Sequence, residues 1–148
     1  MNSIQRKKTE LVARTVINKL SGIKFIEFEN DSSIWTDKCK NTLEQFHSLD
    51  SIPTDFIKVG KSRNEYVLWV QNTLSFFNGK KEWLILVPNC DEPIWANVLI
   101  TDFNAAIASL WDTSECNEFV IVDKKSQQVA AIFNEEKGYE LHKMVLTK

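Results

Sequence analysis

The spacing of apolar residues changes along the chain, and this change limits the folds that are open to it. In the first part, apolar residues such as Leu11, Val16 and Leu20 recur at helical spacing. In the last third, short apolar runs alternate with turns, and Phe119–Val122 and Val129–Phe133 predict the two strands of a hairpin. We therefore expect an α+β fold in which a mainly antiparallel sheet packs against helices, with this C-terminal hairpin followed by one further strand.

Local patterns predict the individual elements. Helices are expected over residues 4–21, 37–49 and 64–78, and from Thr101 or Asp102 to Trp111. Strands are expected at 23–29, 83–87, 95–100, 119–122, 129–133 and 139–146. Two segments have an alternative, because 64–78 contains a strand-like core at 66–70 and 139–146 also suits a short helix. The long apolar pattern of 64–78 favours a helix. In the first helix, the apolar face is expected to hold Ile4, Leu11, Val12, Thr15, Val16 and Leu20.

Length and composition predict one globular domain over residues 1–148. Hydrophobic residues make up 43% of the 148 residues, so the chain can bury a core without disulfides. Cys39, Cys90 and Cys116 are widely spaced and form no CxxC motif, which predicts reduced thiols. The first residues are polar, and no segment reaches the length and apolarity of a membrane span. We expect a soluble cytoplasmic protein.

The charge distribution is uneven. From Glu82 to Asp123 the chain carries eight acidic residues and no Lys or Arg. Residues 1–81 carry thirteen basic and nine acidic side chains, and residues 124–148 carry five basic and three acidic ones. The net charge of −2 for the whole chain therefore hides a local charge of −8 between Glu82 and Asp123. The small total predicts no general affinity for nucleic acid or for a membrane. The acidic window predicts either a solvated face or a docking face for a basic protein.

Motifs that carry chemistry are missing from the sequence. The chain has no GxGxxG, GxSxG, HExxH or EF-hand pattern, and only four glycines from which a phosphate loop could be built. His47 is expected at a helix end on the surface and His142 on a solvated strand face. The adjacent acids Asp91 and Glu92 suit a solvated loop better than a metal or a carboxylate pair. We therefore expect no catalytic residues, no metal, no cofactor and no enzyme activity.

The tryptophans divide into expected core residues and candidate anchors for a partner. Trp69 and Trp83 lie in apolar runs, whereas Trp35, Trp95 and Trp111 have polar or loop neighbours. We expect the loop at 89–93 and the loop after the helix ending at Trp111 to lie near the ends of neighbouring strands. The predicted partner-binding surface combines acids of these loops with an aromatic anchor. Its residues are Asp91, Glu92, Trp95, Trp111, Asp112, Glu115 and Glu118.

The last third of the chain resembles a known family. A helix opens at Ile100–Ile107, a strand and turn follow at Asn117–Lys125, and a second strand returns at Val129–Glu135, with Gly138 shortly after. This arrangement is similar to small α+β immunity proteins of bacterial contact-dependent growth inhibition and polymorphic toxin systems. It differs from their pattern at Glu135 and Glu136, where a pair of histidines is expected. The resemblance is structural and implies no particular binding residues.

The resemblance implies a protein that binds and blocks a toxin domain. Many toxins of this kind are nucleases, whose substrate clefts are basic because they hold phosphates. Carboxylates at the rim of an inhibitor would speed association, and an aromatic anchor would hold the complex. The sequence therefore predicts a cytoplasmic immunity protein acting on a cognate toxin with a basic surface. The alternative is a regulatory or scaffold protein that docks its acidic face on another basic protein.

Overall fold

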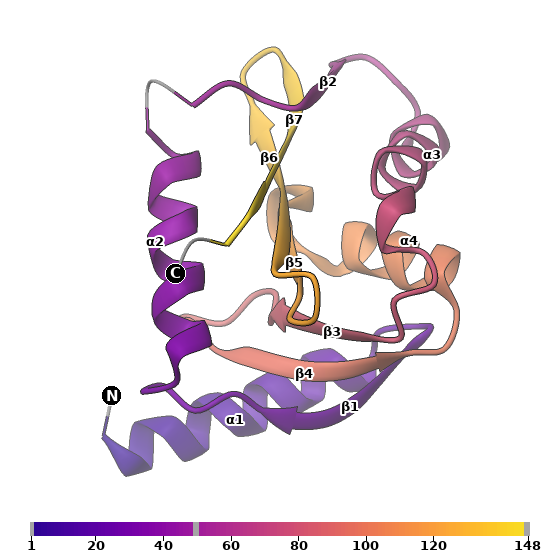
Figure 1. Ribbon diagram of the computed structural model, residues 1–148. Helices are drawn as coiled ribbons and strands as arrows, with labels where there is room; N and C mark the ends of the chain where they lie inside the picture. The colour runs from indigo at the N-terminus through magenta and orange to yellow at the C-terminus, as the bar shows by residue number, and fades with distance from the viewer. Residues whose placement is uncertain (1, 49–50, 147–148) are drawn as a thin grey trace.

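A seven-stranded antiparallel sheet organises the fold, as the computed structural model shows for residues 2–48 and 51–146 (Figure 1). The helices are α1 (Ser3–Asn18), α2 (Ile34–Phe46), α3 (Arg63–Thr73) and α4 (Phe103–Thr113), with 3-10 turns η1 (Ser75–Phe77) and η2 (Glu115–Asn117). The strands are β1 (Ile23–Phe28), β2 (Asp55–Lys58), β3 (Glu82–Leu86), β4 (Trp95–Ile100), β5 (Phe119–Asp123), β6 (Gln128–Glu135) and β7 (Gly138–Val145). Their order in the sheet is β1-β4-β3-β5-β6-β7-β2. The expected α+β fold, with its C-terminal hairpin, is confirmed.

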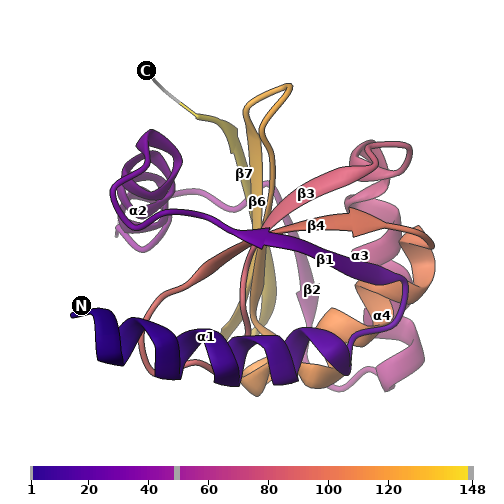
Figure 2. The ribbon, with the colours of Figure 1, turned by 90° about the horizontal axis from the view of Figure 1, so that it is seen from below.

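The sheet separates two apolar clusters, because successive side chains of a strand point to opposite faces. On β3, Trp83 and Ile85 join the larger cluster with α1, α3 and α4, whereas Leu84 joins the smaller cluster with α2. Figure 2 shows α2 on one side of β6 and β7, and α3 and α4 on the other. Both faces of the interior strands are covered, so β5 is buried at every position.

The sheet bends sharply at its middle. β3 pairs with β4 at five positions but with β5 only at Leu84–Val122 and Ile85–Ile121. As a result β1, β4 and β3 run at a steep angle to β5, β6 and β7 (Figure 1). The two halves therefore diverge on either side of this short junction.

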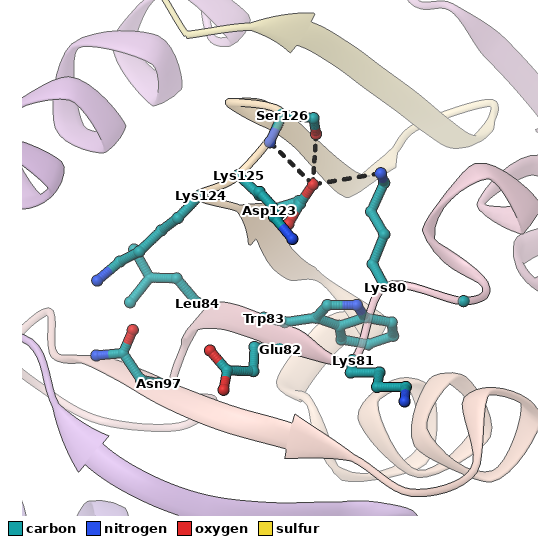
Figure 3. A pocket seen from close by; sticks show the side chains of 11 residues that line it. Lys80, Lys81, Glu82, Trp83, Leu84, Asn97, Asp123, Lys124, Lys125 and Ser126 are labelled. Atoms are coloured by element: carbon teal, nitrogen blue, oxygen red, sulfur yellow. Dashed lines mark hydrogen bonds and ion pairs between the residues drawn. The ribbon is translucent and has the colours of Figure 1, made fainter.

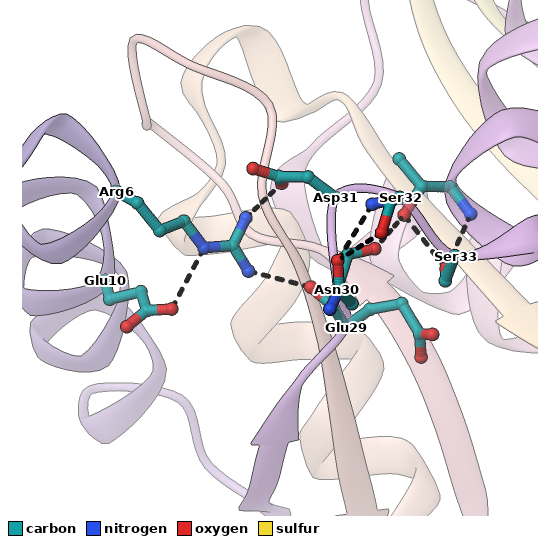
Figure 4. Close-up of polar contacts among 8 residues, drawn as sticks. Arg6, Glu10, Glu29, Asn30, Asp31, Ser32 and Ser33 are labelled. Carbon is teal, nitrogen blue, oxygen red and sulfur yellow. Dashed lines mark hydrogen bonds and ion pairs between the residues drawn. The ribbon is translucent and has the colours of Figure 1, made fainter. Parts of the chain in front are cut away.

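Arg6 ties α1 to the segment between β1 and α2 (Figure 4). Its guanidinium donates to the Glu10 carboxylate at 2.9 Å, to the Glu29 carbonyl oxygen at 2.7 Å and to the Asp31 carboxylate. Arginine suits this position because its planar fork serves several acceptors at once. The same segment continues to Ser33, whose hydroxyl accepts from the Thr36 N–H and caps α2.

Several element boundaries differ from the sequence-based prediction. The second helix begins at Ile34, three residues before the predicted start, because Ser33 is its N-cap. Between the second and third helices, where no strand was predicted, the chain forms an edge strand, β2, which pairs with β7. The alternatives at 64–78 and 139–146 resolve as a helix and a strand. The second helix ends at Phe46, and residue 49, its predicted last residue, lies outside the described residues.

The apolar face of the first helix was predicted only in part, because Val16 and Leu20 pack in the larger cluster as expected. The buried residues of α1 are Ala13 and Ile17, whereas Ile4, Leu11 and Val12 are exposed. The helix ends at Asn18 and lies against β1 with a narrow face, so Ile4, Leu11 and Val12 remain outside the core. No helix among the described residues has the length and apolarity needed to cross a membrane.

Candidate functional site

An acidic hollow lies where the β3–β4 loop, η2 and the end of α2 meet. Its volume is about 370 Å³, and three of the predicted site residues line it: Asp91, Glu115 and Glu118. Among the described residues that line it, none is Lys or Arg. The expectation that the loop at 89–93 and the loop after α4 lie side by side is therefore confirmed.

Asn89 holds these two loops together. Its side-chain amide donates to the Thr113 carbonyl oxygen at 2.7 Å, and its side-chain oxygen accepts from the Glu115 N–H at 2.8 Å. The residue sits in the left-handed region with φ 62°, a conformation that asparagine adopts more readily than most residues. Asn89 thus fixes the distance between the Asp91 loop and η2, and so the shape of the hollow.

The three carboxylates have different surroundings. The Glu118 carboxylate accepts from the Asn134 N–H at 2.9 Å, which holds it beside β6. The carboxylates of Asp91 and Glu115 have no ion-pair or hydrogen-bond partner among the described residues. Both side chains are exposed, so they remain available to a positively charged group from outside.

The floor of the hollow is apolar. Leu43 of α2, Leu86 of β3 and Phe133 of β6 line it, and the exposed His47 ring packs on Phe133 with 4.5 Å between centroids. An apolar floor beneath free carboxylates suits a side chain with an aliphatic stem and a cationic head. Lysine and arginine are the two side chains of this kind.

Cys90 also lines the hollow but shows no sign of a catalytic role. Burial raises the pKa of its thiol, and the charge of the Asp91 carboxylate raises it further. A thiol with a raised pKa is a poor nucleophile near neutral pH. The Cys90 thiol is therefore not activated as a nucleophile.

Two of the predicted acidic residues lie outside the hollow. Asp112 is held by Arg63 of α3, whose Nε lies 2.9 Å from the Asp112 Oδ1. Its charge is therefore compensated within the molecule. Glu92 is exposed on the same loop as Asp91 but does not line the hollow.

The two predicted aromatic anchors are buried in the structure. Trp95 is 5% exposed and packs in the smaller cluster, and Trp111 is 3% exposed in the larger one. The Trp111 ring stacks on Tyr66 with 5.5 Å between centroids and also contacts Tyr139. Both indoles are enclosed by sheet and helices, so neither forms a surface anchor, and their polar sequence neighbours gave a misleading signal.

Other acids of the window have structural roles. Asp102 is the N-cap of α4 and accepts from the Ala105 N–H. Asp123 is buried and pairs with Lys80. His142, which was expected to be solvated, is also buried, and it contacts Ser51 and Glu140. Within the described part of the chain, no group of three or more His, Cys, Asp or Glu side chains is arranged to hold a metal ion.

The sequence did not identify the apolar half of the hollow. Leu43 lies in α2 and His47 is its C-cap, more than forty residues before the loops that carry the acids, and only the packing of α2 on β6 brings them there. A local signal existed for Asn89, because Asn after Pro88 is a typical turn residue. Comparison of the chain with protein-family models, curated proteins and solved structures found no match. The hollow is therefore defined as the candidate site by its geometry alone.

Proposed function

We propose that the protein is a cytoplasmic immunity protein that binds a basic toxin domain through the acidic hollow. The single observation that supports this function is the pair of uncompensated carboxylates, Asp91 and Glu115, above an apolar floor. In this proposal the partner is a toxin, and a nuclease is the favoured class because its substrate cleft is basic. The protein blocks the toxin by steric and electrostatic occlusion of its basic surface, without turnover and without a cofactor.

A lysine or arginine of the toxin would enter the hollow. Its aliphatic stem would pack on Leu43, Leu86 and Phe133, and its cationic head would reach Asp91 and Glu115. Arginine fits best, because its planar fork donates to two carboxylates at once. Glu118 contributes negative charge while its carboxylate stays bonded to the Asn134 N–H.

The carboxylates and the apolar floor of the hollow contribute differently, to the association rate and to the lifetime of the complex. Exposed carboxylates attract a basic partner over several ångströms, so they mainly raise the association rate. Once the head group is desolvated, losing one member of a bonded charge pair costs about 2–5 kcal/mol of binding free energy. The apolar contacts at the floor mainly slow dissociation.

Growth of cells that carry the toxin tests the proposal. The product of the gene immediately upstream, as the candidate toxin, is expressed together with the wild-type protein, with the double variant Asp91→Lys/Glu115→Lys, or with Glu92→Lys. Glu92 is a control for position, because it is exposed on the same loop but lies outside the hollow. Its reversal changes the net charge by half as much as the double variant. We expect rescue by the wild type and by Glu92→Lys, and loss of rescue with the double variant.

Folding of the variants must be checked separately. Asp91 and Glu115 are exposed and form no ion pair within the described chain, so their reversal should change the free energy of unfolding by no more than about 0.5 kcal/mol each. If the double variant is folded and still rescues growth, the hollow is not the toxin-binding surface. If even the wild-type protein neither rescues growth nor binds the toxin, the immunity function itself is wrong.

A further inference from the structure

The junction of β3 and β5 leaves an open wedge in the sheet. Pairing stops at Leu84–Val122. Continued in the same register, the ladder would place Trp83 opposite Asp123, Glu82 opposite Lys124 and Lys81 opposite Lys125. Instead the strands separate, and a hollow of about 870 Å³ opens between the start of β3 and the β5–β6 turn (Figure 3).

Lysines dominate the lining of this wedge. Four of them, Lys80, Lys81, Lys124 and Lys125, stand against two carboxylates, Glu82 and Asp123. Glu29 pairs with Lys124 from outside the lining, so the excess is reduced to one positive charge. This positive balance favours an anion.

Two of the four lysines are already engaged. The Lys80 Nζ reaches across the wedge to the Asp123 carboxylate at 3.3 Å, and Lys124 pairs with Glu29. Asp123 also accepts from the Ser126 N–H and hydroxyl, so its charge is largely compensated (Figure 3). Lys81 and Lys125 are exposed and have no partner among the described residues.

A buried donor without an acceptor also belongs to this wedge. Trp83 lines it and is 1% exposed, and its Nε1–H has no hydrogen-bond partner in the described part of the chain. Figure 3 shows the indole nitrogen on the ring edge turned toward the Lys80 side chain. Buried N–H groups nearly always have an acceptor, so an unpartnered one indicates a place for an acceptor atom from outside the chain.

We infer that the wedge between β3 and the β5–β6 turn binds a small phosphate-bearing anion. Lys81 and Lys125 would approach the phosphate from opposite sides, Lys80 would share one of its remaining N–H donors, and the Trp83 Nε1–H would donate to one oxygen. Ammonium groups bind phosphate as point charges and need no fixed fork geometry. The volume accommodates a free phosphate or a nucleotide, and the terminal phosphate supplies the same chemistry in both.

This site is separate from the acidic hollow and needs no partner protein, so it is tested on the isolated full chain. The five tryptophan indole N–H signals are followed in a ¹H–¹⁵N correlation spectrum, and the Trp83 signal is assigned with Trp83→Phe. Sodium phosphate and ADP are titrated separately at constant ionic strength, with chloride as the reference anion. We expect a saturable downfield shift of the Trp83 signal with either phosphate compound and no saturable shift with chloride.

Substitution of the two free lysines gives the decisive comparison. Lys81→Gln/Lys125→Gln should weaken binding by about tenfold or more, whereas Lys7→Gln/Lys8→Gln, which removes two exposed lysines of α1, should leave it unchanged. The remaining signals of each spectrum report whether the variant is folded. Tighter binding of ADP would identify a nucleotide as the source of the phosphate, and equal binding would identify free phosphate. A Trp83 signal that does not move at millimolar phosphate, or equal affinity of the Lys81/Lys125 variant, would overturn the inference.

Discussion

Replacing Asn89 by alanine should loosen the acidic hollow and destabilise the fold measurably. The change removes two side-chain hydrogen bonds, to the Thr113 carbonyl oxygen and from the Glu115 N–H, at 2.7 and 2.8 Å. Because the site is exposed, each bond contributes about 0.5–1 kcal/mol. Alanine at φ 62° adds about 1 kcal/mol of backbone strain. The expected loss in the free energy of unfolding is therefore about 2–3 kcal/mol.

A second substitution at the same position separates the two contributions. Asn89→Gly also loses both bonds, but glycine accepts the left-handed conformation, so it should lose only about 1–2 kcal/mol. Urea unfolding followed by tryptophan fluorescence gives both values, provided that the slope of the transition is unchanged. If Asn89→Ala costs less than about 0.5 kcal/mol, Asn89 does not hold the loops as described. If the two variants are equally stable, the left-handed conformation of Asn89 adds no strain to the alanine variant.

Three further predictions concern other parts of the fold. Burial, the larger cause, and the nearby Glu29 charge raise the pKa of the Cys39 thiol to about 12. In the native protein a thiol reagent should therefore modify exposed Cys116 and reach Cys39 only on unfolding. Rapid labelling of both thiols would contradict the packing of α2. Burial raises the pKa of the Asp123 carboxyl, but hydrogen bonds from Ser126 and Lys80 outweigh it and leave the pKa below the ordinary 3.8. The ionised Asp123 carboxylate therefore stabilises the fold above pH 3.8, and this stabilisation is lost as the pH falls through the lower pKa of the folded state. In urea unfolding measured across that pH range, Asp123→Asn should reduce the acid-induced loss in the free energy of unfolding. If the free energy of unfolding falls in parallel for the two proteins, the prediction is refuted. A Cβ at Gly138 would lie 2.0 Å from the Ile57 carbonyl oxygen. Gly138→Ala should therefore separate β2 from β7 and lower the free energy of unfolding by about 2 kcal/mol or more, with faster amide exchange in β2. Unchanged amide exchange would show that the strand pair adapts.

The parts of the fold that depend on local sequence were predictable. The region from Asp102 to Val145 follows the expected helix, hairpin and final strand closely, because each element carries its own cap, turn or alternation. The edge strand β2 was not predictable in the same way. Its residues, Asp55–Lys58, show no clear alternation, and it becomes a strand by pairing with β7, more than eighty residues later.

The candidate site was predictable only in part. The acids Asp91, Glu115 and Glu118 were found because charge segregation is visible in a sequence. Burial is a tertiary property, so Trp95 and Trp111 were misjudged from their neighbours in the chain. The apolar floor combines residues of α2, β3 and β6, and no local pattern connects them.

The association rate with the toxin of the adjacent gene tests the central claim most directly. The rate is measured by stopped-flow at low and at high salt for the wild-type protein, for Asp91→Lys/Glu115→Lys and for Glu92→Lys. If binding occurs through the acidic hollow, the double variant should associate at least about tenfold more slowly than the wild type at low salt. High salt should reduce this difference in association rate, because it screens the charges. Glu92→Lys should associate at a rate close to that of the wild type. A folded double variant that associates as fast as the wild type at low salt would contradict the claim.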